Sequence, residues 1–206
     1  MSVTDWIGQT SREVRIRELR SGAPGCAAVV RRTYQAGADE LWSAVTSPER
    51  IAQWFLPLSG DLRAGGTFQL EGNAGGEILA CDPPHRLRLT WTFGGAPENE
   101  VTLTLTPAGH GRTTLELEHA GPGEGDGVPP LVLAVGVGWD PALVGLGQYL
   151  SGDHPDRTWW FEPAQAREFT LLSVTAWAAA LDLAKVAAPE VVAATAEQTL
   201  MFYAPE

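Results

Sequence analysis

Three successive segments in the middle of the chain alternate apolar and polar residues with the two-residue period of a β-strand. They span residues 87–93, 101–106 and 113–119, and Gly94-Gly95 and Gly109-His110-Gly111 lie between them. Strands joined by such short turns must be antiparallel, and strict alternation indicates one buried and one solvated face. We therefore predict an antiparallel sheet whose apolar face carries Leu87, Leu89, Trp91, Phe93, Val101, Leu103, Leu105, Leu115, Leu117 and His119.

The segments before this region predict further strands and two short helices. Residues 12–19 are expected to form an extended arm, and residues 26–34, 67–72 and 77–82 are expected to form strands. The two helices begin at the acidic residue Asp39 and at Ser47-Pro48, which have the composition of helix N-termini. By simple parity Glu71 and Asn73 lie on a solvated face, and a solvated position is also favoured for Glu77.

A longer helix is predicted around Trp139–Leu150, where Asp140 followed by Pro141 is typical of an N-cap. It is the nearest helix with enough apolar surface to cover the apolar face of the sheet. The Gly-rich segment 121–127 before it lacks the Lys-Ser/Thr of a phosphate-binding loop. The pattern thus predicts a helix packed on a sheet, the α+β class.

The last quarter of the chain predicts a helical hairpin. Phe169, Leu172 and Ala176 have helical spacing, and a second helix is expected from Pro189 to Phe202 or Tyr203. We predict two parts, residues 1–152 and a C-terminal extension of residues 153–206. The extension is expected to pack on the first part or on a second copy of the chain as a homodimer, with Trp159-Trp160-Phe161 wedged at that contact.

Composition narrows the class of protein. The formal net charge of −11 disfavours nucleic acid as a partner, because phosphates require clustered Lys and Arg. The N-terminus does not have the pattern of a secretory signal, and no apolar run approaches the length of a membrane helix, so we expect a cytoplasmic protein without membrane contact. Abundant Ala, Gly and Arg suggest a bacterial source, and two isolated Cys predict free thiols rather than a disulfide.

Residue types that carry chemistry are few. The strong catalytic motifs are missing, and the four His residues have no metal-ligand spacing, so we predict neither a metal nor a cofactor. His119 is the one candidate for catalysis, because it shares the apolar face with Leu115 and Leu117 at the end of a strand. A His there serves as a hydrogen-bond donor to a ligand or as an acid or base, and the alternative is a His bonded to a loop carbonyl.

Several short motifs occur in the order found in one known superfamily. They are Leu41-Trp42, the sequence SPERIAQWF of residues 47–55, Gly65-Gly66, and DPPHRLRLTW of residues 82–91. Together they resemble the START-like (SRPBCC) superfamily, nearest to its heat-shock protein 90 ATPase activator-like and polyketide cyclase/dehydrase-like bacterial branch. The resemblance covers residues ~10 to 150 and implies a helix-grip fold, in which a curved antiparallel sheet surrounds a long helix and an apolar cavity.

Three functions follow as hypotheses. The first is binding of a small hydrophobic or aromatic ligand between the sheet and the long helix. The second is a cyclase/aromatase- or dehydratase-like enzyme that uses the same cavity, and the third is a chaperone-associated interaction module. For the first, the residues predicted to line the ligand site are Trp54, Phe68, Trp91, Leu103, Leu117, His119 and Trp139.

Overall fold

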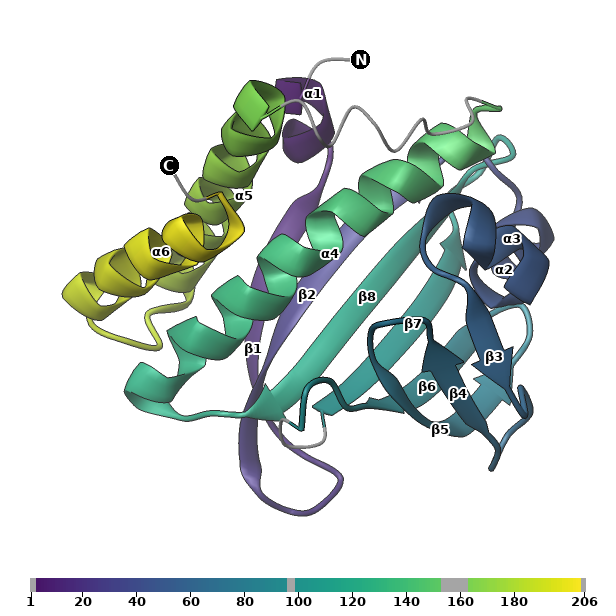
Figure 1. The fold of residues 1–206 in the computed structure, drawn as a ribbon, viewed down its shortest axis with the longest axis horizontal. Helices are drawn as coiled ribbons and strands as arrows, with labels where there is room; N and C mark the ends of the chain where they lie inside the picture. Colours follow the sequence, from purple (N-terminus) through teal and green to yellow (C-terminus); the bar gives the residue numbers. More distant parts are fainter. Residues whose placement is uncertain (1–2, 96–98, 153–162, 205–206) are drawn as a thin grey trace. The chain divides into compact units, whose positions relative to one another are not determined.

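A computed structural model describes residues 3–95, 99–152 and 163–204, and it has eight strands in one antiparallel sheet (Figure 1). The strand order is β1-β2-β8-β7-β6-β5-β4-β3. The strands are β1 (Ser11–Glu18), β2 (Pro24–Tyr34), β3 (Leu58–Gly60), β4 (Thr67–Leu70), β5 (Gly75–Asp82), β6 (Arg86–Trp91), β7 (Asn99–Pro107) and β8 (Thr113–Pro122).

Six α-helices and one short 3-10 helix lie within the described residues. They are α1 (Val3–Gly8), α2 (Ala38–Thr46), α3 (Pro48–Trp54), the 3-10 helix η1 (Gly125–Gly127), α4 (Val128–Leu150), α5 (Pro163–Ala184) and α6 (Pro189–Tyr203). A curved antiparallel sheet, a long helix and a C-terminal pair of helices confirm the predicted α+β helix-grip fold (Figure 1). The short helix α1, the three-residue strand β3 and the 3-10 helix η1 were not predicted.

The alternation predicted for β6, β7 and β8 is confirmed, with two exceptions. Phe93 is 55% exposed because β6 ends at Trp91, so the strand period no longer applies to it. Thr90, on the face predicted to be solvated, is buried because the backbone N–H of Glu77 donates to its hydroxyl at 2.8 Å. Glu71 and Asn73 are exposed, as parity predicted, and Glu77 is exposed, as was favoured for it.

A register shift in β5 changes which side chains of that strand face the core. Ile78 pairs with Leu89, but Ala80 pairs with Arg88, so Leu79 is an extra residue in this strand. An inserted residue of this kind reverses the side-chain parity on either side of it. Alternation alone therefore could not predict which side chains of β5 face the core.

Helices α2 and α3 help to cover the sheet. Pro48 is the first residue of α3 and Ser47 its N-cap, as predicted, although the Ser47 hydroxyl bonds Glu49 instead of the backbone. The N-cap of α2 is Gly37, so the prediction that Asp39 caps this helix was wrong by two residues. Half-buried Trp42, Trp54 and Phe55 pack against the sheet residues, so the long helix is not the only cover of the apolar face.

Helix α4 begins at Val128, eleven positions before the predicted start, and Asp140 lies inside it. The prediction that Asp140 is an N-cap was therefore wrong. The segment Gly125–Leu150 is long and apolar enough to cross a membrane by length and composition alone. However, 61% of its apolar 18-residue stretch is buried inside the protein. Such burial is typical of a core helix in a soluble protein.

The chain divides into two compact units. Of the described residues, the first unit contains 3–30, 120–141 and 163–204, and the second contains 31–95, 99–119 and 142–152. The long helix contributes to both. A division into domains at residue 152 stays a prediction.

The C-terminal helices form as predicted and belong to the first unit. Arg167, near the start of α5, donates to the carbonyl of Ala204 just after α6, so the two helices are antiparallel. Helix α5 packs against β1 and α1, and its Trp177 is fully buried. Trp159, Trp160 and Phe161 lie outside the described residues.

Glycines in α4 allow aromatic residues to approach the helix closely. In the first unit, a Cβ added to Gly136 would lie 2.7 Å from the indole nitrogen of Trp177. In the second unit, a Cβ on Gly145 would lie 2.9 Å from the carbonyl oxygen of Trp54. Both distances are shorter than a van der Waals contact, so neither position accepts a larger residue without movement of its neighbour.

We expect Gly136→Ala to destabilise the protein, although alanine favours helix. Overpacking a buried aromatic ring costs about 1–3 kcal/mol, which exceeds the ~1 kcal/mol that alanine gains in helix propensity. Urea unfolding monitored by circular dichroism measures the difference. Gly127→Ala is the matched control, because a Cβ there meets nothing within 4 Å. A Gly136→Ala protein as stable as the control variant would contradict the close packing.

Candidate functional site

Strand β8 carries a buried histidine on its inner face, three residues before the strand ends at Pro122 and not at the strand end where it was predicted. Along the strand, Leu115, Leu117 and His119 are buried, and the residues between them are half-buried. His119 is 2% exposed, so the prediction that it faces the interior with the two leucines is confirmed. It is the polar residue at one end of an otherwise apolar stretch of the sheet.

His119 contacts an amide and an aromatic ring from the neighbouring hairpin. Its Nε2 lies 3.0 Å from Nδ2 of Asn99, and its ring meets Trp91 edge-on with centroids 6.0 Å apart. Asn99 and Trp91 are register partners in strands β7 and β6. If the amide donates this bond, the imidazole is the neutral tautomer with its proton on Nδ1.

Burial keeps this imidazole neutral. Desolvation lowers the pKa of His119 from 6.5 to about 3, because the interior disfavours the charged form. At neutral pH the ring therefore has one donor and one acceptor nitrogen, and Nε2 contacts Asn99. A group with so low a pKa is a weak proton acceptor, so the ring is better suited to orient a ligand than to remove a proton.

An apolar cluster adjoins Trp91 in the same unit. Phe68 is buried within it, its ring centroid 5.9 Å from that of Trp91, and Leu103 packs at its edge. Trp54 also packs against this cluster and donates its indole N–H to the carbonyl of Ala44 at 3.0 Å. The structure thus places Trp54, Phe68, Trp91 and Leu103 against one cluster, and His119 touches it through Trp91.

Two other predicted residues have a less direct relation to this cluster. Leu117 is 3% exposed and lies two positions before His119 on the same face of β8. Trp139 is half-buried and lies in the part of α4 that belongs to the first unit. Their contribution to a ligand site stays a prediction, as does the whole set of lining residues.

Sequence reasoning missed several polar residues of the interior. Asn99 is half-buried at the start of β7, and no pattern linked it to His119. Arg32, Tyr34 and Thr113 are buried, although all three lie in predicted strands. Their parity with Val30 and with Leu115 was the signal that could have identified them.

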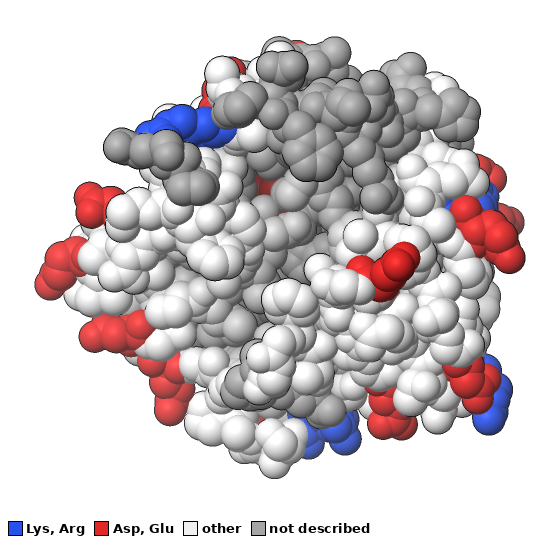
Figure 2. Space-filling view, in the orientation of Figure 1, with Lys and Arg blue, Asp and Glu red and all other residues white. Residues whose placement is uncertain are grey.

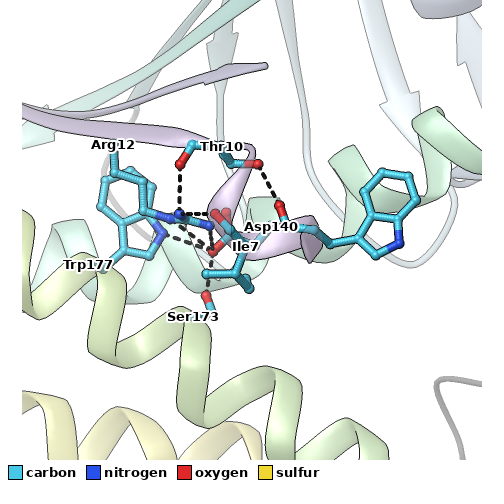
Figure 3. Close-up of polar contacts among 7 residues, drawn as sticks. Ile7, Thr10, Arg12, Asp140, Ser173 and Trp177 are labelled. Carbon is cyan, nitrogen blue, oxygen red and sulfur yellow. Dashed lines mark hydrogen bonds and ion pairs between the residues drawn. The ribbon is translucent and has the colours of Figure 1, made fainter. Parts of the chain in front are cut away.

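A second group of buried polar side chains lies in the first unit, around Asp140 (Figure 3). Arg12 approaches Oδ2 of this carboxylate at 2.9 Å, and both side chains are almost completely buried. The hydroxyl of Ser173 and the indole N–H of Trp177 donate to the same oxygen at 2.5 and 3.2 Å. Arg12 also donates to the carbonyl oxygens of Ile7 and Thr10, so the network joins α1, β1, α4 and α5.

Opposing effects act on the Asp140 carboxyl. Burial raises its pKa, while Arg12, Ser173 and Trp177 favour the charged form and lower it. Its other oxygen, Oδ1, is buried and has no hydrogen-bond partner among the described residues. A network that links four elements far apart in sequence is best explained as structural, and we assign it no chemistry.

Within the described residues, no cluster of three or more His, Cys, Asp or Glu side chains has the geometry of a metal site. Cys26 and Cys81 are free thiols, and burial raises the pKa of Cys26 to about 11, which makes it unreactive. Figure 2 shows more acidic than basic side chains on the face in view, consistent with the net charge of −11.

Comparison with known proteins identifies relatives of the whole fold. Residues 35–151 match the family model described as "Activator of Hsp90 ATPase homolog 1-like protein". The chain is 40% identical to CalU16 from Micromonospora echinospora, with a TM-score of 0.68 to the crystal structure over 84% of this chain and 98% of that one. The solution structure of CalU16 gives 39% identity and a TM-score of 0.73 over 84% and 95% of the two chains.

Two further relatives match over shorter regions. DynU16, a protein of the dynemicin biosynthetic locus, is 33% identical over 63% of this chain and 48% of its own, with a TM-score of 0.55. An uncharacterized protein of Schizosaccharomyces pombe is 32% identical over 81 residues, which are 37% of this chain and 24% of that protein. The match therefore spans about a quarter of the yeast protein.

Proposed function

We propose that this chain binds a small apolar or aromatic molecule on the inner face of its sheet. The chain belongs to the Activator of Hsp90 ATPase homolog 1-like family, which falls within the predicted superfamily. His119 supplies the orienting hydrogen bond, and Trp91 and Phe68 supply aromatic surface. The supporting observation is a neutral, buried His119 edge-on to Trp91 at the margin of an apolar cluster. Most ligand sites combine a large apolar surface with a few polar groups of this kind.

A relative supports a small molecule as the ligand. DynU16 comes from a biosynthetic locus, where proteins meet small organic compounds, and it is 33% identical to this chain over 63% of the chain. We therefore propose a biosynthetic small molecule as the ligand of this chain. A cytoplasmic location, as expected from the sequence, remains part of the proposal.

Binding is favoured over cyclase- or dehydratase-like catalysis. Those reactions use an acid or a base that changes protonation near neutral pH, and a pKa of about 3 removes His119 from that range. The pairing of His119 with Asn99 instead fixes the orientation of the ring.

The proposal predicts uptake of a neutral aromatic probe. N-phenyl-1-naphthylamine fluoresces in apolar surroundings, and its electron-rich aromatic amine can accept a hydrogen bond from the Nδ1–H of the neutral imidazole. His119→Leu should weaken its binding by roughly 2–12-fold, the equivalent of one hydrogen bond of about 0.5–1.5 kcal/mol. Fluorescence titration measures both dissociation constants.

The matched control removes a histidine from the surface of the same unit. His110 is exposed in a turn with a φ of 52°, which asparagine tolerates, so His110→Asn should bind the probe like the unaltered protein. No uptake by the unaltered protein, or equal affinity in His119→Leu and His110→Asn, would refute the role proposed for His119.

A further inference from the structure

The pairing of three strands in the second unit places an amide side chain against His119. Asn99 is the first residue of β7, and it is half-buried. It is the register partner of Trp91 in β6, and β7 lies between β6 and β8 in the sheet. Register partners share one face of a sheet, so Asn99 lies on the face of Trp91 and reaches His119 on the neighbouring strand.

The hydrogen bond between the two side chains has a defined direction. The amide nitrogen Nδ2 of Asn99 lies 3.0 Å from Nε2 of His119. An amide nitrogen only donates hydrogen bonds, so Nε2 must be the acceptor and carries no proton. A neutral imidazole holds one proton, which is then on Nδ1.

Burial strengthens this choice of tautomer. His119 is 2% exposed, so bulk water cannot replace a lost partner at the ring. The other tautomer would direct a ring N–H at the amide N–H of Asn99, and neither donor would have an acceptor at that contact. A buried donor without an acceptor disfavours a state by about tenfold or more. The amide therefore fixes the tautomer for as long as its nitrogen faces the ring.

We propose that Asn99 is a positioning residue, which holds His119 as the Nδ1–H tautomer and so selects ligands with an acceptor oxygen, such as aromatic ketones. The proposal rests on the proposed function, because the ligand is the one inferred there. The accepting nitrogen of the ring is bonded to Asn99, so the ring binds a ligand as a donor. A carbonyl oxygen accepts such a bond, and the aromatic part of the ketone suits the ring of Trp91.

NMR of the unaltered protein identifies the tautomer without any ligand. Protonated and unprotonated ring nitrogens of histidine have well-separated chemical shifts, which long-range proton–nitrogen spectra of the isotopically labelled protein measure. At neutral pH we expect the shift of an unprotonated nitrogen for Nε2 of His119 and that of a protonated nitrogen for Nδ1. A protonated Nε2 would place the amide oxygen of Asn99 against the ring and would overturn the proposal.

Asn99→Asp reverses the direction of the bond with little change in shape. Its carboxylate only accepts, so Nε2 of His119 should become protonated, whether the ring is neutral or charged. Asn73→Asp is the matched control and should leave the His119 shifts unchanged. Asn73 is exposed in the turn before β5, and its Oδ1 accepts from the backbone N–H of Ala74 at 2.8 Å, a contact that aspartate can keep. An unprotonated Nε2 in Asn99→Asp would overturn the role of Asn99.

A second variant tests the same point if Asn99→Asp does not fold. Asn99→Leu has nearly the same shape and offers neither a donor nor an acceptor to the ring. The two tautomers of His119 should then approach equal populations, so the shift of Nε2 should move toward the protonated value. The dispersion of the backbone NMR signals reports whether each variant is folded. A shift equal to that of the unaltered protein would contradict control of the tautomer by Asn99.

Two naphthalenes of nearly the same shape test the ligand class. A carbonyl oxygen in 2-acetylnaphthalene replaces a methyl group of 2-isopropylnaphthalene, and displacement of bound N-phenyl-1-naphthylamine measures both affinities. Comparing the ratio of these affinities between proteins cancels the difference in hydrophobicity of the two compounds. The ratio should favour the ketone about tenfold less in Asn99→Asp, at a pH at which its His119 ring is neutral, because Nδ1 then has no proton to donate. Asn73→Asp should keep the ratio of the unaltered protein.

The outcomes separate this proposal from the function on which it rests. An unchanged ratio in Asn99→Asp, although Nε2 is protonated, would overturn the ligand class and leave binding of an apolar molecule intact. A fall of the ratio in Asn73→Asp as large as that in Asn99→Asp would also overturn it. If the unaltered protein takes up neither the dye nor either naphthalene, the proposed function fails and the ligand class fails with it, even where NMR confirms the tautomer.

Discussion

Replacing Asp140 with alanine is expected to lower the free energy of unfolding by about 3–5 kcal/mol, the largest effect of any single change proposed here. The substitution leaves the buried guanidinium of Arg12 without its carboxylate, and it leaves Ser173 and Trp177 without their acceptor. For a chain of this size the Tm should fall by roughly 6–20 °C. Chemical unfolding at neutral pH measures the free energy, and differential scanning calorimetry measures the Tm.

Two comparisons separate the stability lost with the ion pair from the stability lost with side-chain packing. The double variant Arg12→Met/Asp140→Leu removes both charges and should recover much of the lost stability, because the cost arises from one unpaired buried charge. The exposed pair Arg63–Asp61 is the control, and Asp61→Ala should change stability by less than about 0.5 kcal/mol. If Asp140→Ala is no more harmful than Asp61→Ala, the buried network has no structural role.

Acidification is expected to destabilise the protein through His119. Its pKa is about 3 in the folded protein and 6.5 in the unfolded chain. Below pH 6.5 the unfolded chain therefore binds a proton that the folded protein does not bind. The free energy of unfolding accordingly falls as the pH falls from 6.5 toward 3. The loss should reach about 2 kcal/mol by pH 5, at 1.36 kcal/mol for each unit of pH.

The contribution of His119 to the pH dependence of stability is obtained by comparing the unaltered protein with His119→Leu. His119→Leu has no imidazole to protonate, so its stability should fall less steeply than that of the unaltered protein between pH 6.5 and pH 5. His110→Asn should keep the steeper slope, because the buried imidazole remains. Urea unfolding at several pH values measures these slopes. Equal slopes in the unaltered protein and in His119→Leu would contradict the burial of a neutral imidazole.

The sequence was sufficient to predict the parts of the fold that depend on short-range periodicity. Side chains alternate strictly along an uninterrupted strand. The two-residue period of β6, β7 and β8 therefore predicted that these strands pair and that His119 faces the interior. The same rule failed where the strand was interrupted. Leu79 is an extra residue in β5, and Phe93 lies beyond the end of β6.

The polar interior could not be predicted, because its contacts join residues far apart in sequence. Asp140 followed by Pro141 has the composition of an N-cap, but its partner Arg12 lies 128 positions away, and α4 continues through the proline. Arg32 lies in a segment recognised as a strand, yet arginine on a strand usually faces solvent. Its parity with buried Val30 on the same strand was the one signal in the sequence that placed it on the interior face.

The central claim, a ligand held at Trp91 and His119, is tested most directly by NMR of the isotopically labelled protein titrated with N-phenyl-1-naphthylamine. The account predicts that the largest chemical-shift changes occur at the indole N–H of Trp91, the ring of His119 and the side-chain amide of Asn99. Changes concentrated instead at Met201 and Phe202, which are 64% and 78% exposed on α6, would contradict it and favour an interaction module. The absence of any shift change would contradict binding altogether.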